Sequence, residues 1–424
     1  MSAIIVTVFC VSYLLIALEH GIRVNKAAIA LIGGVLCWTV YILFTPQKEV
    51  VIESLTIHLG ELSQILFFLL GAMTIVELID AHNGFEIITS RIQTRKKSKL
   101  VWIVGFVTFF LSAVLDNLTT TIVMVSLVRK LIHDKKERLL FIGLIVIAAN
   151  SGGAWSPIGD VTTTMLWIGK RITAGTIVKE LILPSLVSVV VPMLLMQTMM
   201  KGEVKRTDSS VQQAGENSRV LYRNLVFFCG IGALLFVPVF KTLTELPPFM
   251  GMMICLGVLW VIIEMLYRGK EEASRFTITH VLRRIDTPSI LFFLGILLAI
   301  SALESVGELR SLALTLDKNL GDPDLIVISI GLISSVIDNV PLVAASMGMY
   351  PLSYYPTDHF FWEFLAYCAG TGGSALIIGS AAGIAAMGLE RITFMWYLKK
   401  ITWLALIGYF AGAVTFLLLQ GLMN

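Results

Sequence analysis

Charge is scarce in this sequence. Only 14% of its 424 residues are Asp, Glu, Lys or Arg, whereas ordinary soluble domains have about a quarter. The net charge of +3 is too small to indicate nucleic-acid binding. Hydrophobic residues make up 56%, and apolar segments long enough to cross a membrane recur along the chain. The composition predicts an all-α polytopic membrane protein in contact with membrane lipid.

Cysteine is also rare, and no CxxC spacing occurs. This pattern favours buried packing thiols over disulfides or a resident metal site. The five cysteines are Cys10, Cys37, Cys229, Cys255 and Cys368. The first apolar run has no basic segment before it, so we expect a retained helix rather than a cleaved signal.

A Ser-x-x-x-Asp-Asn pattern occurs twice inside apolar runs, 222 positions apart (338 − 116). Its members are Ser112, Asp116, Asn117, Ser334, Asp338 and Asn339. A carboxylate in hydrocarbon costs about 2.5 to 3.5 kcal/mol on insertion scales, so two in matching positions indicate a functional site. The alternative is structural, because a buried Asp can also cap a broken helix.

The apolar pattern divides the chain into two similar halves, residues 1–200 and 222–424, joined by a polar linker at 201–221. Each half is predicted to have three spans, a re-entrant hairpin, a helix broken by glycines, and a final span. Spans are expected near 3–18, 25–44, 62–81, 177–199, 224–240, 248–267, 288–304 and 396–420. The hairpins are expected at about 100–128 and 325–348, and the broken helices at 139–168 and 361–389.

Five crossings in each half would invert the second half relative to the first. The loops agree with this topology. If the linker is cytoplasmic, loops on its side carry 25 of the 32 Lys and Arg, including Lys26, and leave seven for the other side. This asymmetry follows the positive-inside rule and predicts that both termini face outward.

The paired pattern, together with the segment from Asn150 to Thr164, resembles the NhaD-type sodium/proton antiporters of the ion-transporter superfamily. The resemblance covers nearly the whole chain. It implies exchange of sodium or lithium for protons across a bacterial cytoplasmic membrane, with no cofactor. It also implies a scaffold domain that forms a homodimer and a transport domain of hairpins and broken helices that moves like an elevator.

A dehydrated sodium or lithium ion prefers oxygen ligands, which unwound helices and polar side chains supply. Candidates for ion binding and proton exchange in the first half are Ser112, Asp116, Asn117, Thr119, Thr120, Asn150, Asp160, Thr162 and Thr163. In the second half they are Ser334, Asp338, Asn339, Thr371 and Ser374. The threonines could instead bond to their own helix backbone.

Sodium itself is expected nearer the first hairpin, because the second half has Ser380 where the first has Asp160. The predicted sodium ligands are Asp116, Asn117, Asn150, Asp160 and Thr162.

Two other functions compete with this interpretation. The first is a carboxylate/sodium symporter or arsenite transporter of the same superfamily. The resemblance speaks against a symporter, because the symporter relatives carry Ser at the positions of Asp116 and Asp338. The four hairpin and broken-helix segments also lack Lys, Arg and His, which disfavours an anion. An intramembrane aspartyl protease is the second, but its Gly-x-Gly-Asp motif would need Gly at Pro157. The sequence therefore predicts a transporter and not an enzyme.

Overall fold

The computed structural model describes residues 1–17, 24–89, 92, 94–200, 202–204, 217–268, 278–336 and 338–423. Within these ranges the chain is helical, with one isolated bridge between Lys96 and Glu203 and no strand. Nine of the described helices are long and apolar enough to cross a membrane. The prediction of an all-α polytopic membrane protein is confirmed. Most of the expected linker, 201–221, lies outside the described residues.

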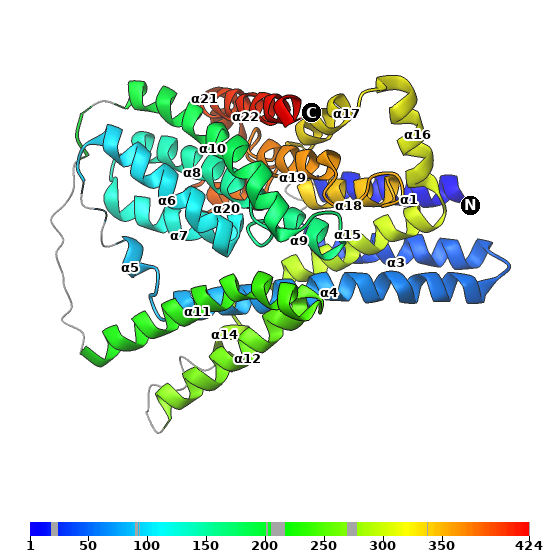
Figure 1. The fold of residues 1–424 in the computed structure, drawn as a ribbon, viewed down its shortest axis with the longest axis horizontal. Helices are drawn as coiled ribbons and strands as arrows, with labels where there is room; N and C mark the ends of the chain where they lie inside the picture. The colour runs from blue at the N-terminus through cyan, green and yellow to red at the C-terminus, as the bar shows by residue number, and fades with distance from the viewer. Residues whose placement is uncertain are drawn as a thin grey trace.

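The helices form two layers (Figure 1), which we call the scaffold group and the core group. The scaffold group consists of α1 (Ser2–Ala17), α3 (Lys26–Phe44), α4 (Lys48–Ala81), α11 (Asn217–Thr244), α12 (Pro248–Tyr267) and α15 (Thr287–Ser305). The indole of Trp38 in α3 donates a hydrogen bond to the carbonyl of Leu298 in α15 at 2.9 Å, which joins the N-terminal and C-terminal halves of the chain inside this group.

The core group contains eight shorter segments that form four interrupted pairs. They are α6 (Lys97–Leu115) with α7 (Asn117–Leu131), α8 (Lys135–Ala154) with α9 (Val161–Ile168), α17 (Pro323–Ile333) with α18 (Asn339–Met349), and α19 (Phe360–Gly372) with α20 (Ala381–Glu390). Helices α10 (Ala174–Met199) and α22 (Thr402–Met423) pack against each other and against this group.

Among the described spans, burial is highest in a helix of the core group and lowest in a helix of the scaffold group. The most apolar window of α8 is 83% buried, whereas that of α11 is 28% buried. Helix α8 therefore lies at the centre of the core group, and α11 presents most of its apolar surface outward, as a lipid-facing helix does. The short helices α5 (Glu86–Thr89), α14 (Ile278–Leu282), α16 (Glu308–Leu320) and α21 (Phe394–Lys400) connect the longer ones.

Three predictions from the sequence need correction. Helix α4 begins at Lys48, well before the expected start of the span at residue 62, and the expected final span is divided into α21 and α22. The amphipathic α16 was not predicted at all. Of the five cysteines, which are all free, only three are buried, because Cys10 is exposed and Cys229 is half-buried.

Candidate ion-binding site

The candidate site lies where four half-helices of the core group begin, and a polar residue caps each of these half-helices. Helices α7, α9, α18 and α20 have the N-caps Asp116, Asp160, Asp338 and Ser380, respectively. In three of the four, the side chain of the cap accepts a hydrogen bond from its own helix. Because a helix begins with unpaired N–H groups, these oxygens satisfy donors that would otherwise be buried in an apolar region.

Asp160 is the centre of this arrangement and is 2% exposed. Its Oδ1 accepts hydrogen bonds from the backbone N–H and the hydroxyl of Thr162, both at 3.0 Å. Its Oδ2 accepts from the side-chain amides of Asn117 at 2.8 Å and Asn339 at 3.4 Å. One carboxylate thus contacts the first turns of α9, α7 and α18, from both halves of the chain.

Asp116 lies at the joint between α6 and α7 with φ of +112°, in a region that L-residues rarely occupy. Its carboxylate accepts hydrogen bonds from the backbone N–H of Thr119 at 2.7 Å and from its hydroxyl at 3.0 Å. The residues that follow Asp116 and Asp338 in the chain, Asn117 and Asn339, both donate hydrogen bonds to Asp160, so the three aspartates belong to one region. Strained backbone of this kind persists only where the surroundings enforce it, and it often occurs at functional sites.

Asn150 of α8 connects the two halves of the chain. It is fully buried, its Oδ1 accepts a hydrogen bond from Asn117 at 3.0 Å, and its Nδ2 donates to Ser380 at 2.9 Å. Ser380 was not among the predicted site residues. The available signal was its position in the repeat, which corresponds to that of Asp160, but a serine in an apolar run carries no charge that would single it out.

The broken helices approach the hairpins closely at two glycines. A Cβ on Gly152 would lie 2.1 Å from the backbone oxygen of Phe109, and one on Gly372 would lie 2.0 Å from that of Gly331. Hydroxyl groups reinforce both crossings. Ser112 donates to the carbonyl of Ala149 at 2.6 Å, and Ser334 donates to that of Ala369 at 3.1 Å. These two predicted serines therefore hold helices together in corresponding ways.

The hydroxyl groups of the remaining predicted residues differ in their hydrogen-bond partners. Thr163 donates to the backbone oxygen of Asp160 at 2.9 Å, whereas the buried hydroxyl of Thr120 has no hydrogen-bond partner among the described residues. Thr371 and Ser374 donate to carbonyls of their own helix region, both at 2.6 Å. Hydrogen bonds thus connect most first-half candidates to Asp160 or to Asp116, with the exception of Ser112 and Thr120. They join neither Thr371 nor Ser374 to the network around Asp160.

Lys26 is a charged residue that the sequence did not assign to this region. It was counted among the loop residues, but it is the first residue of α3, and its Nζ lies 3.6 Å from Oδ2 of Asp338. The four core segments lack basic residues, but Lys26 of the scaffold group gives one carboxylate of this region, that of Asp338, a basic partner.

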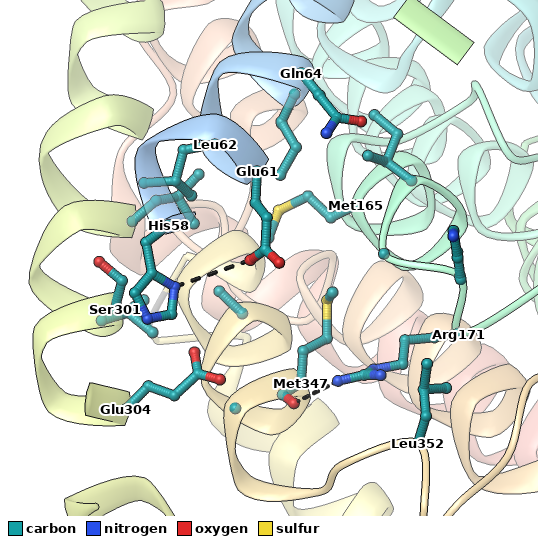
Figure 2. Close-up of a pocket in the computed structure, with 18 of the residues that line it drawn as sticks. His58, Glu61, Leu62, Gln64, Met165, Arg171, Ser301, Glu304, Met347 and Leu352 are labelled. Carbon is teal, nitrogen blue, oxygen red and sulfur yellow. Dashed lines mark hydrogen bonds and ion pairs between the residues drawn. The ribbon is translucent and has the colours of Figure 1, made fainter. Parts of the chain in front are cut away.

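A cavity of about 540 Å³ lies between the scaffold and core groups (Figure 2). His58 and Glu61 of α4 and Glu304 of α15 line its scaffold wall, and Met347 of α18 lines the core wall. Arg171, just beyond α9, donates a hydrogen bond to the backbone oxygen of Met347 at 2.9 Å. His58 and Glu61, which precede the span expected near 62–81, lie within α4.

This cavity lies at the far ends of the two half-helices that begin at Asp160 and Asp338. Helix α9 has eight residues, so it carries the chain about 12 Å from the candidate site to the cavity at 1.5 Å per residue. Gly169 and Gly348, at the other ends of α9 and α18, both line the cavity. The cavity and the candidate site are thus the two ends of the same pair of helices.

Polar contacts between the two halves of the chain hold the core group at both ends. At one end, Arg129 and Arg138 pair with the buried Glu390, and the Arg138 contact measures 3.0 Å. At the other, the carboxylate of Asp358 accepts hydrogen bonds from the backbone N–H of Thr173 at 2.6 Å and from its hydroxyl at 2.9 Å. These contacts bind the hairpins and broken helices into one body.

Crossed broken helices around the buried carboxylate of Asp160, within a bundle of apolar spans, define the class of protein: a polytopic membrane transporter. Comparisons with known proteins agree. Residues 13–363 match a family model described as citrate transporter.

Three curated relatives align along nearly the whole chain. Sodium/proton antiporter 1 of Arabidopsis thaliana is 50% identical over 98% of this chain and 72% of its own length. Sodium/proton antiporter 2 of the same plant is 48% identical over 96% and 97%. The Na(+)/H(+) antiporter NhaD of Vibrio cholerae is 31% identical over 97% and 91%. The chain belongs to the NhaD-type family of the ion-transporter superfamily, whose named members are transporters rather than enzymes.

Proposed function

We propose that this protein exchanges sodium for protons across a membrane, and that the ion binds beside Asp116 and Asp160. The observation that carries the proposal is the identity of the caps: three of the four half-helices begin with an aspartate. Among the described residues, neither Asp116 nor Asp160 has a Lys or Arg ion-pair partner. The buried carboxylate of Asp160 and the half-buried carboxylate of Asp116 are thus left for a mobile cation.

The helix N-termini alone would favour an anion and not a cation. Each helix N-terminus carries about half a positive charge, so four of them together amount to about two. Such a place binds anions when its caps are neutral. This consideration and the name of the matching family model make sodium-coupled citrate or other carboxylate symport the second candidate. The aspartate caps decide against it, because carboxylates at Asp116 and Asp160 repel an anionic substrate at the same N-termini.

Antiport follows when sodium and protons compete for the same carboxylates. A buried carboxylate must be neutralised, and either a cation or a proton can do this. The proposed sodium ligands are oxygens of Asp116, Asn117, Asn150, Asp160 and Thr162. The unpartnered hydroxyl of Thr120 is a further available oxygen close in sequence to Asp116. Lithium, as a smaller cation with the same preference for oxygen, is included in the proposal.

The proposed movement is elevator-like. The core group is tied internally at both ends by Glu390 and Asp358, whereas the cavity separates part of it from α4 and α15. These features favour sliding of the core group as a unit against the scaffold group. The cavity would then be the vestibule on one side. The corresponding contacts of Ser112 and Ser334 support two repeats, residues 1–200 and 222–424, which we propose to have inverted topology.

Location and assembly remain part of the proposal. A bacterial cytoplasmic membrane with both termini outside stays a prediction, since the relatives with 50% and 48% identity are from a plant. A homodimer formed through the scaffold group also stays a prediction. The wide apolar surface of α11 offers a suitable face for either lipid or a second copy.

The decisive experiment uses everted membrane vesicles that contain the full chain. Their interior is acidified by respiration, and a pH-sensitive dye reports the proton gradient. Addition of sodium should release protons within seconds, whereas succinate, citrate and arsenite should not. A response to citrate that requires sodium, with no response to sodium alone, would replace antiport by symport.

A further inference from the structure

Asp338 differs from the other caps of the half-helices. The side chains of Asp116, Asp160 and Ser380 each accept a hydrogen bond from the helix that follows, but that of Asp338 makes no such bond. Its Oδ2 instead lies 3.6 Å from the ammonium group of Lys26. The carboxylate at the tip of the second hairpin is thus directed across to the scaffold group and not toward its own helix.

The scaffold group fixes the position of Lys26. The side chain of Asn25 caps α3 by accepting a hydrogen bond from the backbone N–H of Ala27 at 2.8 Å. The Nζ of Lys26 also lies 4.2 Å from the centre of the Phe292 ring of α15, a distance suited to a cation–π interaction. Two scaffold helices therefore hold the ammonium in place.

Helix α3 does not itself stabilise the ammonium of Lys26 at its N-terminus. A cation at a helix N-terminus is opposed by the helix dipole. The side chain is also only 26% exposed, and that of Asp338 is 18% exposed. A largely buried ammonium needs a compensating negative charge, and Asp338 is the carboxylate beside it. The pair is thus a mutual neutralisation, unlike a solvated surface salt bridge, which contributes little.

We propose that Lys26 is the resident counter-ion of the second hairpin: its ammonium neutralises Asp338, so that the transported cation is left only the half of the site formed by Asp116 and Asp160. This inference rests on the proposed exchange function and adds to it the number of sodium ions bound per chain. The protein supplies one cation itself, from the scaffold group, and binds one sodium per chain. Lys26 acts through Asp338 as a positioning residue and does not touch the transported ion.

The test measures sodium bound at saturation per chain, at pH 9, on the purified full chain, for the wild type and three variants. Lys26→Gln removes the ammonium and leaves Asp338 uncompensated. Lys26→Arg keeps the charge, and Lys26→Gln combined with Asp338→Asn removes both charges together. Sodium-driven proton movement in proteoliposomes is measured in parallel for each protein.

The wild type and Lys26→Arg should bind one sodium per chain. Lys26→Gln should bind two, because the freed carboxylate acquires a cation, and the double variant should return to one. Two sodium ions on the wild type, or an unchanged ratio of one in folded Lys26→Gln, would overturn the assignment of Lys26 while leaving antiport intact. Absence of sodium-driven proton movement in the wild type would instead refute the proposed function, and this inference with it.

Discussion

Replacement of Asp160 by Asn tests the centre of the candidate site with almost no change in size. The Oδ1 side can still cap α9 through Thr162, because Asn and Asp are equally good caps. The Oδ2 position, however, would lose its hydrogen-bond acceptor. An amide nitrogen in place of Oδ2 would face the donating amides of Asn117 and Asn339, which now bond to that oxygen at 2.8 and 3.4 Å. The substitution also removes the negative charge.

The expected magnitude follows from these contacts. A hydrogen bond to a charged group contributes about 1.5 to 3 kcal/mol, and a buried donor without a partner costs a similar amount. A loss of about 3 kcal/mol in sodium binding corresponds to an increase of the apparent sodium KM of about a hundredfold, at about 1.4 kcal/mol per factor of ten. The assay is a sodium titration of proton release in everted vesicles at one pH.

Asp134→Asn is the matched control. Asp134 also caps a helix, α8, and its side chain accepts a hydrogen bond from the backbone N–H of Glu137 at 2.9 Å, but it lies at an exposed end. This variant should keep the wild-type KM. A KM for Asp160→Asn within threefold of wild type, with equal amounts of protein in the membrane, would refute the placement of the ion beside Asp160.

Other substitutions give distinct outcomes. Asp116→Asn should abolish sodium-dependent proton release while the protein still inserts, and robust release would remove Asp116 from the site. Thr371→Ala and Ser374→Ala should change the sodium KM by less than about threefold, because each hydroxyl bonds only a backbone carbonyl; a loss equal to that of Asp160→Asn would place the ion symmetrically between the two halves of the chain. Gly152→Ala should strongly reduce folded protein, as judged by size-exclusion chromatography, because its Cβ would overlap the Phe109 backbone; a normal elution profile would contradict the close crossing.

Much of the core group was predictable from the sequence. The interruption of α6 and α7 at Asp116 and of α8 and α9 before Asp160 was expected, since polar residues and glycines in the middle of an apolar run are typical of a broken membrane helix. Asn117 and Asn150 were also expected near Asp160, and hydrogen bonds join the three side chains. The duplicated pattern supplied this information, because each half constrained the interpretation of the other.

The parts that were missed depend on information that hydropathy does not contain. The pair of Lys26 and Asp338 joins residues 312 positions apart (338 − 26) in different groups of helices, and a lysine before an apolar run looks like an interfacial anchor. The first turns of α4 were missed because the stretch around Glu53, His58 and Glu61 is too polar for an apolar window. Tertiary packing against α15, including a 3.1 Å contact between His58 and Ser305, accompanies that extension.

The most direct test of sodium–proton exchange at the aspartate-capped site uses purified protein in proteoliposomes. Vesicles loaded with sodium are diluted into sodium-free buffer, with no citrate present, and radioactive sodium efflux and internal pH are recorded together. The wild type should lose sodium while its interior acidifies, and the Asp116→Asn variant should do neither. Sodium efflux without acidification, or efflux only when citrate is added, would contradict exchange at these carboxylates.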